Sequence, residues 1–391
     1  MKILYFISVH GHGRGGHFHS LNHISKKIGE NHVVKIISFG PGKSDIIESN
    51  PHFLRHIDFN GLNIFKLRKI IKQETRKFRP DIYHCFDEGS YNIVRLIVSS
   101  TKNILVLNKC GGPNPTNFPH VKNLILFSLE NQEWLKNQNK YKNTNIHLIP
   151  NRVKSLQLHP DFNPIEKNHG DFIFMRICRI GHTYKKSIQD SINLISKLLE
   201  YNIKNVKLYL IGVVQDTDVF EEFNNHAFSK SGHLTILTES KYTNEASRML
   251  YLADAVIGTG RGLMEAASLG KPLLAINKNG EIPVLLNELN FDDAFRTNFS
   301  ERNVFPGFKN NDNIKSISKI VNDKVSYNEN CSFVIQSFEK YFSLEKAKEA
   351  YPKAYKVSKT SKRKLISDLP FILRSILGFY SSSSNLTKKQ L

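Results

Sequence analysis

The sequence predicts an α/β fold of two doubly wound, parallel-sheet domains, and three observations lead to that prediction. Short apolar runs rich in β-branched and aromatic residues alternate with segments of helical period through most of the chain. Most of these runs are apolar throughout, as strands are when helices cover both faces of their sheet. The length of 391 residues exceeds the usual size of one domain and favours two.

The strands and helices are expected in a regular order. The expected strands are Ile3–Val9, Val33–Phe39, Ile82–Phe86, Ile104–Leu107, Leu124–Phe127, Ile146–Ile149, Phe172–Ile177, Lys207–Ile211, Leu234–Leu237, Ala255–Ile257 and Leu273–Ile276. The expected helices include His19–Ile28, Ile64–Lys77, Ser187–Leu199, Asn244–Leu252 and Leu263–Leu269.

A polar segment containing Pro160, Pro164 and Gly170 interrupts this order, which resumes at Phe172. We therefore expect a Rossmann-like domain at 1–160, a second at 168–335, and a C-terminal crossover helix with a basic tail at 336–391.

The composition points to an anionic partner in a reducing compartment. The formal net charge is +20, which favours nucleic acid, an acidic membrane face or a phosphate-bearing ligand. The four cysteines show no C-x-x-C spacing, which favours a cytoplasmic protein without disulfides or a zinc knuckle. No apolar run reaches the ~18 residues that a membrane span needs.

The first motif is the glycine-rich loop Gly11-His12-Gly13-Arg14-Gly15-Gly16-His17 after the first strand. Such loops let backbone amides approach a phosphate or a sugar at a helix N-terminus; a connector without a ligand is the alternative. The second strand leads into Phe39-Gly40-Pro41-Gly42 without the acidic residue of dinucleotide sites, so no nicotinamide cofactor is expected. His19 and His23 have helical spacing but no carboxylate or cysteine beside them, so no metal is expected.

The second motif places Arg179 just after a strand, and Lys185 and Lys186 at the start of the next helix. Arginine offers a planar fork and lysine a compact charge, which together suit a leaving diphosphate. A solvated basic loop is the alternative.

The third motif runs from Ala253 to Pro272, where a strand enters Gly258-Thr259-Gly260-Arg261-Gly262-Leu263 and then a helix. The amides of Gly262 and Leu263 are expected at the helix N-terminus, where they suit a phosphate. Glu265 in the first turn either caps that turn or accepts hydrogen bonds from ribose hydroxyls.

Taken in order, these segments resemble the retaining, nucleotide-sugar-dependent glycosyltransferases of family 4, which have the GT-B fold. The segments that carry the resemblance are Gly15-Gly16, Arg79-Pro80-Asp81-Ile82-Tyr83-His84, Ile149-Pro150-Asn151-Arg152-Val153, Arg179 with Lys185 or Lys186, Leu208-Tyr209-Leu210-Ile211-Gly212 and Glu265–Leu274. The resemblance implies two Rossmann-like domains facing a central cleft, with the donor mostly on the C-terminal one.

The resemblance also implies roles for these residues. Arg179, Lys185 and Glu265 are the expected catalytic residues, with His84 and His17 as further candidates facing the cleft. The residues expected to bind substrate are Gly15, Gly16, Lys186, Gly212, Arg261, Gly262, Leu263 and Glu265. Such enzymes need no metal and no other cofactor.

Three positions depart from the family pattern. Ile257 stands eight residues before Glu265, where the family often has a first glutamate. Cys178 replaces a glycine before Arg179, and Asn108-Lys109-Cys110 stands where a histidine is common.

The expected function is transfer of a hexose or N-acetylhexosamine from a nucleoside-diphosphate sugar, preferably of UDP, to a surface-glycan or lipid-linked acceptor with retention. An inactive family member that serves as the binding subunit of a partner transferase is the alternative. No nucleic-acid partner is expected, because no segment resembles a nucleic-acid-reading module. The expected location is the cytoplasm, at the inner face of the membrane.

The C-terminal tail has two interpretations. Leu365–Tyr380 is apolar and aromatic and follows Lys359, Lys362, Arg363 and Lys364, a combination that suits a helix on an anionic membrane surface. Packing of the same segment onto the protein body is the alternative.

Overall fold

The computed structural model describes residues 1–99, 101–158, 162–165, 167–362 and 364–388. The chain forms two compact units, one of residues 1–152 with 344–391 and one of residues 153–343. The sequence predicted one domain at 1–160 and a second at 168–335, and Pro160 lies outside the described residues. Residues 344–391 belong to the same unit as residues 1–152, so the C-terminal segment returns to the first unit.

The first unit is built on a parallel sheet of order β3-β2-β1-β4-β5-β6-β7. Its strands are β1 Lys2–Ser8, β2 Val33–Gly40, β3 Phe53–Asp58, β4 Ile82–Cys85, β5 Ile104–Lys109, β6 Asn123–Leu126 and β7 Asn145–Leu148. Its α-helices are α1 Gly16–Gly29, α2 Asp45–Glu48, α3 Ile64–Phe78, α4 Glu88–Ile97, α5 Leu129–Lys136, α14 Ala347–Val357 and α15 Leu369–Lys388.

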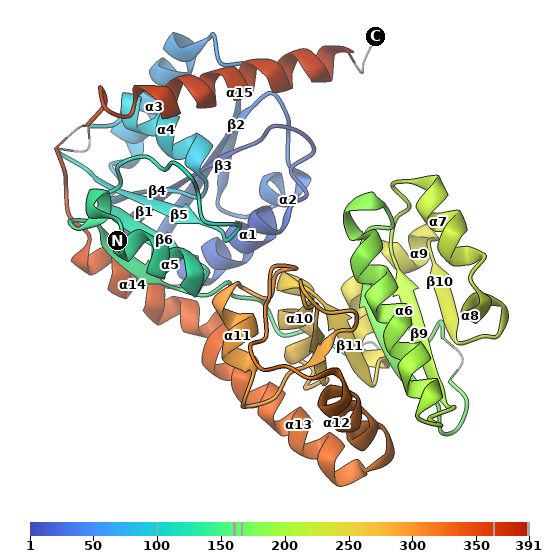
Figure 1. The fold of residues 1–391 in the computed structure, drawn as a ribbon. Helices are drawn as coiled ribbons and strands as arrows, with labels where there is room; N and C mark the ends of the chain where they lie inside the picture. Colours follow the sequence, from blue (N-terminus) through green and yellow to red (C-terminus); the bar gives the residue numbers. More distant parts are fainter. Residues whose placement is uncertain (100, 159–161, 166, 363, 389–391) are drawn as a thin grey trace. The chain divides into compact units, whose positions relative to one another are not determined.

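Helices cover both faces of this sheet (Figure 1), and the side chains of β1, which point alternately to the two faces, show why. Leu4 and Phe6 belong to one buried cluster, which includes residues of α3, α4 and α15. Ile3 and Tyr5 point to the other face and belong to a second buried cluster, which includes residues of α1 and α14. Because side chains alternate across a strand, an apolar run of this kind fills two cores at once.

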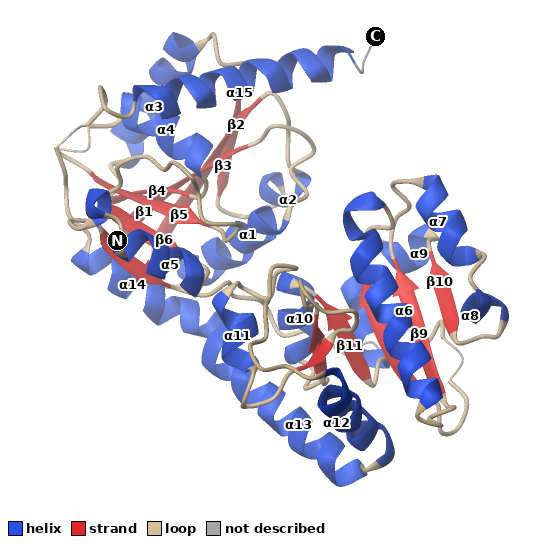
Figure 2. Cartoon of the chain, viewed as in Figure 1, coloured by secondary structure: helices blue, strands red, loops and turns tan. Residues whose placement is uncertain are grey.

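The second unit has the sheet order β10-β9-β8-β11-β12-β13, parallel except for the last pair. Figure 2 draws its strands in red and labels β9, β10 and β11 among them. Its strands are β8 Phe172–Ile177, β9 Val206–Ile211, β10 Leu234–Leu237, β11 Ala255–Gly258, β12 Leu273–Ala275 and β13 Val284–Leu285. Its α-helices are α6 Lys185–Glu200, α7 Thr217–Asn224, α8 Ala227–Lys230, α9 Ser240–Thr243, α10 Gly260–Ala267, α11 Phe291–Arg296, α12 Asn310–Asn322 and α13 Lys324–Ser337.

Most predicted elements are present, with ends shifted by a few residues. The prediction missed β3 and β13, and the predicted helix at Asn244–Leu252 is a 3-10 helix over Ala246–Leu252 preceded by Glu245 in the left-handed region. Helix α10 begins at Gly260, three residues before its predicted start at Leu263. Strand β13 has two residues and the start of α10 is rich in glycine, so apolar periodicity carries little information there, whereas β3 has a polar sequence.

Helix α15 packs onto the first unit. Phe379 is fully buried in the core beside α3 and α4, and Asn92 of α4 donates a hydrogen bond to Ser375. The packing interpretation of the tail is thus confirmed for one face of this helix. No helix among the described residues is long and apolar enough to cross a membrane.

Candidate functional site

The strand order of the second unit defines one place where a ligand is expected to bind. The chain passes from β8 to β9 and β10 on one side of β8, and then crosses to β11 on the other side. In doubly wound sheets, ligands bind beyond the carboxyl ends of the strands at such a reversal. Arg179 follows β8 and α10 follows β11, so the second and third sequence motifs lie at this point.

A cavity of about 240 Å³ lies at the carboxyl end of β11. Its walls come from β8, the 3-10 helix at Ala246–Leu252, β11 and the first turns of α10. They include Ile177, Ser247, Leu250, Gly258, Thr259, Arg261, Gly262 and Glu265. Three of the predicted substrate-binding residues, Arg261, Gly262 and Glu265, therefore share one hollow, whereas Leu263 does not line it.

The N-terminus of α10 faces this cavity. Thr259 is the N-cap in extended conformation, so the first backbone N–H groups of the helix, up to Gly262, have no partner within the helix. The amide of Gly260 donates to Phe299 O at 2.6 Å, so Gly262 is the glycine whose amide is offered to a ligand at this helix end. The expectation that Leu263 offers its amide is wrong, because a helix starting at Gly260 includes that amide in its own ladder.

Arg261 and Glu265 form an ion pair inside the cavity. Nε of Arg261 lies 2.7 Å from Oε1 of Glu265, and each side chain is 16% exposed. Burial raises the pKa of Glu265, and the charge and hydrogen bond of Arg261 oppose that rise. A carboxylate held in this way can accept hydrogen bonds from sugar hydroxyls at the site.

The basic residues of the second motif are arranged differently from the prediction. Arg179 is exposed, and its Nη2 donates to Tyr184 Oη at 2.9 Å. Lys185 forms an ion pair with Glu222 of α7 at 2.6 Å, and Lys186 with Asp190 at 2.7 Å. Each lysine thus has a carboxylate partner of its own within the second unit.

Gly212 has a packing role in this structure. A Cβ atom on Gly212 would lie 1.7 Å from the carbonyl oxygen of Cys178. The end of β9 can therefore approach the segment before Arg179 only without a side chain at 212. In this way Gly212 helps to fix the segment that carries Arg179.

Sequence reasoning missed Arg176, which is 1% exposed at the end of β8. Its Nη2 donates to Ser187 Oγ at 2.6 Å and lies 3.8 Å from Glu301 Oε1, while its Nε and Nη1 have no hydrogen-bond partner among the described residues. One charge within the apolar run Phe172–Ile177 was the available signal, since a buried arginine needs partners. Arg176 joins β8 to the start of α6 and to the segment at Glu301.

The predicted residues of the first unit lie at two depths. Helix α1 begins at Gly16 with Gly15 as its N-cap, and a Cβ at Gly16 would meet open space. His17 is partly buried, and burial lowers its pKa. His84 is fully buried, its Nδ1 lies 2.8 Å from Tyr355 Oη, and burial lowers its pKa to about 3. The expectation that His84 faces a cleft is therefore wrong, since a residue of the crossover helix covers it.

Metal-ligating side chains do not gather in the part of the chain that the structure describes: it has no group of three or more His, Cys, Asp or Glu residues able to hold an ion.

No protein-family model matches the sequence, and no curated protein matches it. Solved structures do match. Anabaena HepE in complex with UDP matches with a TM-score of 0.62 and 14% identity, covering 91% of this chain and 100% of HepE. A glycosyltransferase of Rickettsia africae matches with a TM-score of 0.63 and 15% identity, covering 91% and 97%. The fold is GT-B.

The GT-B fold is shared by proteins with different reactions. A candidate UDP-N-acetylglucosamine 2-epimerase of Listeria monocytogenes also matches, with a TM-score of 0.55, 12% identity and coverage of 91% of this chain and 95% of that protein. The likeness therefore establishes the two Rossmann-like domains, and the argument for a reaction depends on the residues at the carboxyl ends of β8 and β11.

Proposed function

We propose that this chain is a glycosyltransferase that uses a nucleoside-diphosphate sugar, with UDP as the preferred nucleotide. One observation carries the proposal: Arg179, the α10 N-terminus and Glu265 lie at the carboxyl ends of the neighbouring strands β8 and β11. A doubly wound sheet binds nucleotides at that point. The presence of UDP in crystals of the similar HepE supports the choice of nucleotide.

In this proposal the diphosphate binds next to the α10 N-terminus. The amide of Gly262 and the guanidinium of Arg179 offset the charge that grows on the leaving diphosphate. Lys185 and Lys186 add positive charge when the phosphate competes with Glu222 and Asp190 for their ammonium groups. Glu265 accepts hydrogen bonds from the ribose. No metal and no other cofactor is needed.

The transferred group is a hexose or N-acetylhexosamine, and the acceptor is a surface glycan or a lipid-linked sugar. The bond from the sugar carbon to the leaving diphosphate breaks while a bond to the acceptor oxygen forms on the same face, which retains the configuration. The acceptor proton passes to the leaving phosphate. We place this reaction in the cytoplasm at the inner membrane face, where lipid-linked acceptors are accessible.

A second candidate function is that of an inactive binding subunit. Ile257, eight residues before Glu265, is fully buried in β11. Since the residue there is an isoleucine, that position offers no carboxylate to a sugar. A chain that kept nucleotide binding and lost transfer would serve a partner transferase.

Two measurements test the proposal. Calorimetric titration with UDP and with GDP, each with and without EDTA, should show saturable binding of UDP that EDTA does not weaken. Release of UDP from UDP-glucose, UDP-galactose and their N-acetylated counterparts then reports turnover. Failure of the folded protein to bind either nucleotide would overturn the proposal, and UDP binding without turnover of any donor would favour the inactive subunit.

Arg179→Ala is the variant that tests the site, since Arg179 is exposed and its loss should leave the fold intact. We expect weaker UDP binding and strongly reduced turnover. The exposed Arg296 is no suitable control because it has contacts of its own, so Lys315→Ala on the outer side of α12 is the better comparison. Wild-type affinity and turnover in Arg179→Ala would show that the nucleotide binds elsewhere.

A further inference from the structure

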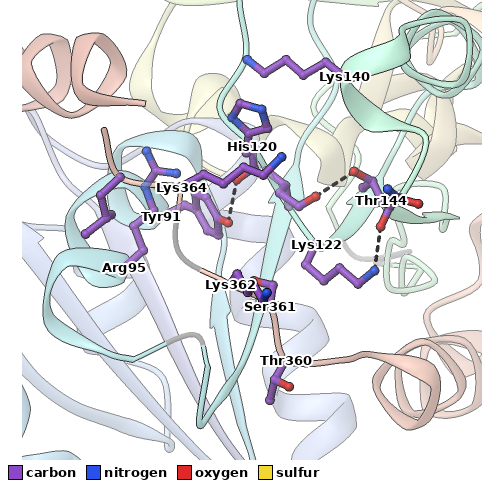
Figure 3. Close-up of a pocket in the computed structure, with 13 residues that line it drawn as sticks. Tyr91, Arg95, His120, Lys122, Lys140, Thr144, Thr360, Ser361, Lys362 and Lys364 are labelled. Carbon is purple, nitrogen blue, oxygen red and sulfur yellow. Dashed lines mark hydrogen bonds between the residues drawn. The ribbon is translucent and has the colours of Figure 1, made fainter. Parts of the chain in front are cut away.

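The first unit contains a cavity of about 350 Å³ at the amino ends of its strands, whereas the glycine-rich loop follows the carboxyl end of β1. Lys122 directly precedes β6 and Thr144 directly precedes β7, so the cavity lies at the amino ends of these parallel strands. Helix α4 and residues 360–362, 364 and 365 complete its walls (Figure 3). The predicted nucleotide site is in the other unit, so this cavity is a separate feature.

Cationic side chains dominate the lining of this cavity. Arg95, Lys122, Lys140, Lys362 and Lys364 line it together with His120. They come from four parts of the chain that are far apart in sequence, as Figure 3 shows. Lys362 and Lys364 are exposed and form no ion pair with a carboxylate among the described residues. A hollow lined by one sign of charge concentrates ions of the opposite sign.

Arg95 leaves hydrogen-bonding capacity unused at this cavity. The residue is 6% exposed, and its Nη1 donates to Asp368 Oδ2 at 2.6 Å. Its Nε and Nη2 are buried and have no hydrogen-bond partner among the described residues. Buried arginine nitrogens are costly to leave without acceptors, and a phosphate oxygen supplies acceptors of the right geometry. The two carboxylate oxygens of Asp368 already contact Arg95 and His120.

An exposed apolar row begins where the cavity wall ends. Leu365 lines the cavity, and next to it Ile366 is 92% exposed. Leu369, Leu373 and Leu377 continue the row at helical spacing along α15, each about half exposed or more. The opposite face of this helix packs into the core through Phe379. Helix α15 therefore has a second apolar face that nothing in the described chain covers.

The exposed apolar surface extends onto the neighbouring helix. Gly61 lies against the α15 backbone at Ile376, since a Cβ there would be 2.5 Å from Ile376 O. Leu62 and Phe65 follow it and are 67% and 80% exposed. Apolar surface of this extent beside basic residues is typical of an interfacial helix on an anionic membrane.

We propose that this cavity binds the headgroup phosphate of an anionic phospholipid while Ile366, Leu369, Leu373 and Leu377 enter the outer part of the same bilayer. The cationic lining and the free nitrogens of Arg95 recognise the phosphate, and the apolar row recognises the membrane that carries it. The inference rests on the proposed function only for the location at a membrane, and it assigns a binding site that the nucleotide chemistry does not use.

The lining argues against a single-stranded nucleic acid in this cavity. Proteins that bind single-stranded nucleic acids stack the bases on exposed aromatic side chains. Tyr91, the aromatic residue of the lining, is 6% exposed and donates its hydroxyl to His120 O at 3.1 Å, so its ring is not accessible to a base.

Vesicle co-sedimentation of the full chain tests the proposal. We expect binding to phosphatidylcholine vesicles that contain phosphatidylglycerol, and little binding to phosphatidylcholine alone. Lys362→Glu with Lys364→Glu should weaken binding at least tenfold. The matched control, Lys315→Glu with Lys324→Glu, makes the same charge change at exposed positions of the other unit and should bind as the wild type does.

A second variant tests the apolar row. Leu369→Ser with Leu373→Ser should also weaken vesicle binding at least tenfold, while calorimetry with glycerol phosphate should give the same affinity as the wild type. Titration with UDP should be unchanged in every variant, so failure of this proposal and failure of the proposed function are distinguishable.

Three results would overturn the proposal. If the wild type ignores phosphatidylglycerol vesicles, the surface is not a membrane site. If the control pair weakens binding as much as Lys362→Glu with Lys364→Glu, the net charge of +20 attracts the protein to the vesicle without a specific binding site. If glycerol phosphate binds but Leu369→Ser with Leu373→Ser keeps wild-type vesicle binding, the cavity takes a soluble phosphate ester instead of a lipid.

Discussion

Nε of Arg261 lies 2.7 Å from Oε1 of Glu265, one turn further along α10, and both side chains line the cavity at the end of β11. The arginine thus offsets part of the cost of burying the glutamate and fixes one of its two oxygens. The pair connects the helix N-terminus, which suits a phosphate, to a carboxylate that suits hydroxyl groups. A nucleoside diphosphate requires both.

Glu265→Ala should weaken UDP binding by about tenfold to a hundredfold, because a hydrogen bond to a charged group contributes roughly 1.5–3 kcal/mol. Calorimetric titration gives the affinity, and circular dichroism checks the fold. Glu329→Ala is the matched control, since Glu329 is exposed in the same unit. Equal UDP affinity in both variants would remove Glu265 from the proposed site.

Much of the fold could be predicted from the sequence, because buried parallel strands are continuous apolar runs. The segment Lys2–Ser8 is apolar at most positions and fills both cores of the first unit, so its prediction was straightforward. Strand β3 was missed because Arg55, His56 and Asp58 make its sequence polar, as suits the edge of a sheet. A sheet edge has solvent beside it and needs no apolar run.

The site could be predicted only in part, because side-chain partners come from distant positions. The sequence predicted that Arg179 follows a strand and that Lys185 and Lys186 begin the next helix, and they lie after β8 and at the start of α6. It could not show that Glu222 and Asp190 hold the two lysines, since one of these partners comes from another helix.

The sequence also did not reveal how deeply each candidate side chain is buried. His84 is the third residue of β4, and Tyr351 and Tyr355 of the C-terminal segment pack against it and help to bury it. A contact across some 270 residues leaves no local pattern.

Gly212→Ala should destabilise the second unit, since its Cβ would lie 1.7 Å from Cys178 O and the backbone would have to move. Overpacking of this kind typically costs about 1–3 kcal/mol. Displacement of the segment before Arg179 should also weaken UDP binding. Urea unfolding followed by circular dichroism measures the loss.

Gly262→Ala is the matched control for stability, because a Cβ at that position meets no atom within 4 Å. Its unfolding midpoint should equal or exceed that of the wild type, since alanine favours a helix over glycine. If the two variants unfold alike, the close approach at Gly212 does not constrain the fold.

His84→Gln should reduce the acid sensitivity of the first unit. Burial holds the pKa of His84 near 3, against 6.5 for a free side chain, so below pH 6.5 the unfolded chain binds a proton that the folded chain does not. The free energy of unfolding therefore falls as pH drops from 6.5 toward 3, by up to about 1.4 kcal/mol per pH unit for this histidine.

Urea unfolding between pH 7.5 and 4.5 measures this slope. Trp134 is the single tryptophan and packs on the core of the first unit, so its fluorescence follows that unit. The slope should be shallower in His84→Gln than in the wild type, and unchanged in His169→Gln, which alters an exposed histidine. Parallel curves for the wild type and His84→Gln would contradict the assignment.

Asp368→Asn should detach the start of α15 from the first unit. The carboxylate of Asp368 is fully buried, accepts from Arg95 Nη1 at 2.6 Å, and lies 2.8 Å from His120 Nδ1. Burial opposes its ionisation, but the hydrogen bonds from Arg95 and His120 keep the pKa of Asp368 below its usual 3.8. Asparagine leaves the Arg95 guanidinium buried without its counterion, and breaking such a pair costs about 3–5 kcal/mol.

The pH dependence of Asp368→Asn follows from the sign of that pKa shift. A carboxyl group with a lowered pKa stabilises the folded chain above pH 3.8, and this contribution is lost as pH falls further. The difference in unfolding free energy between wild type and Asp368→Asn, followed by Trp134 fluorescence, should therefore be largest at neutral pH and shrink below pH 4. Asp58→Asn, at an 81% exposed side chain of the same unit, should change little at any pH. A difference that is equally large at pH 3 and pH 7 would show that asparagine acts through packing, and that the charge of Asp368 does not hold α15 in place.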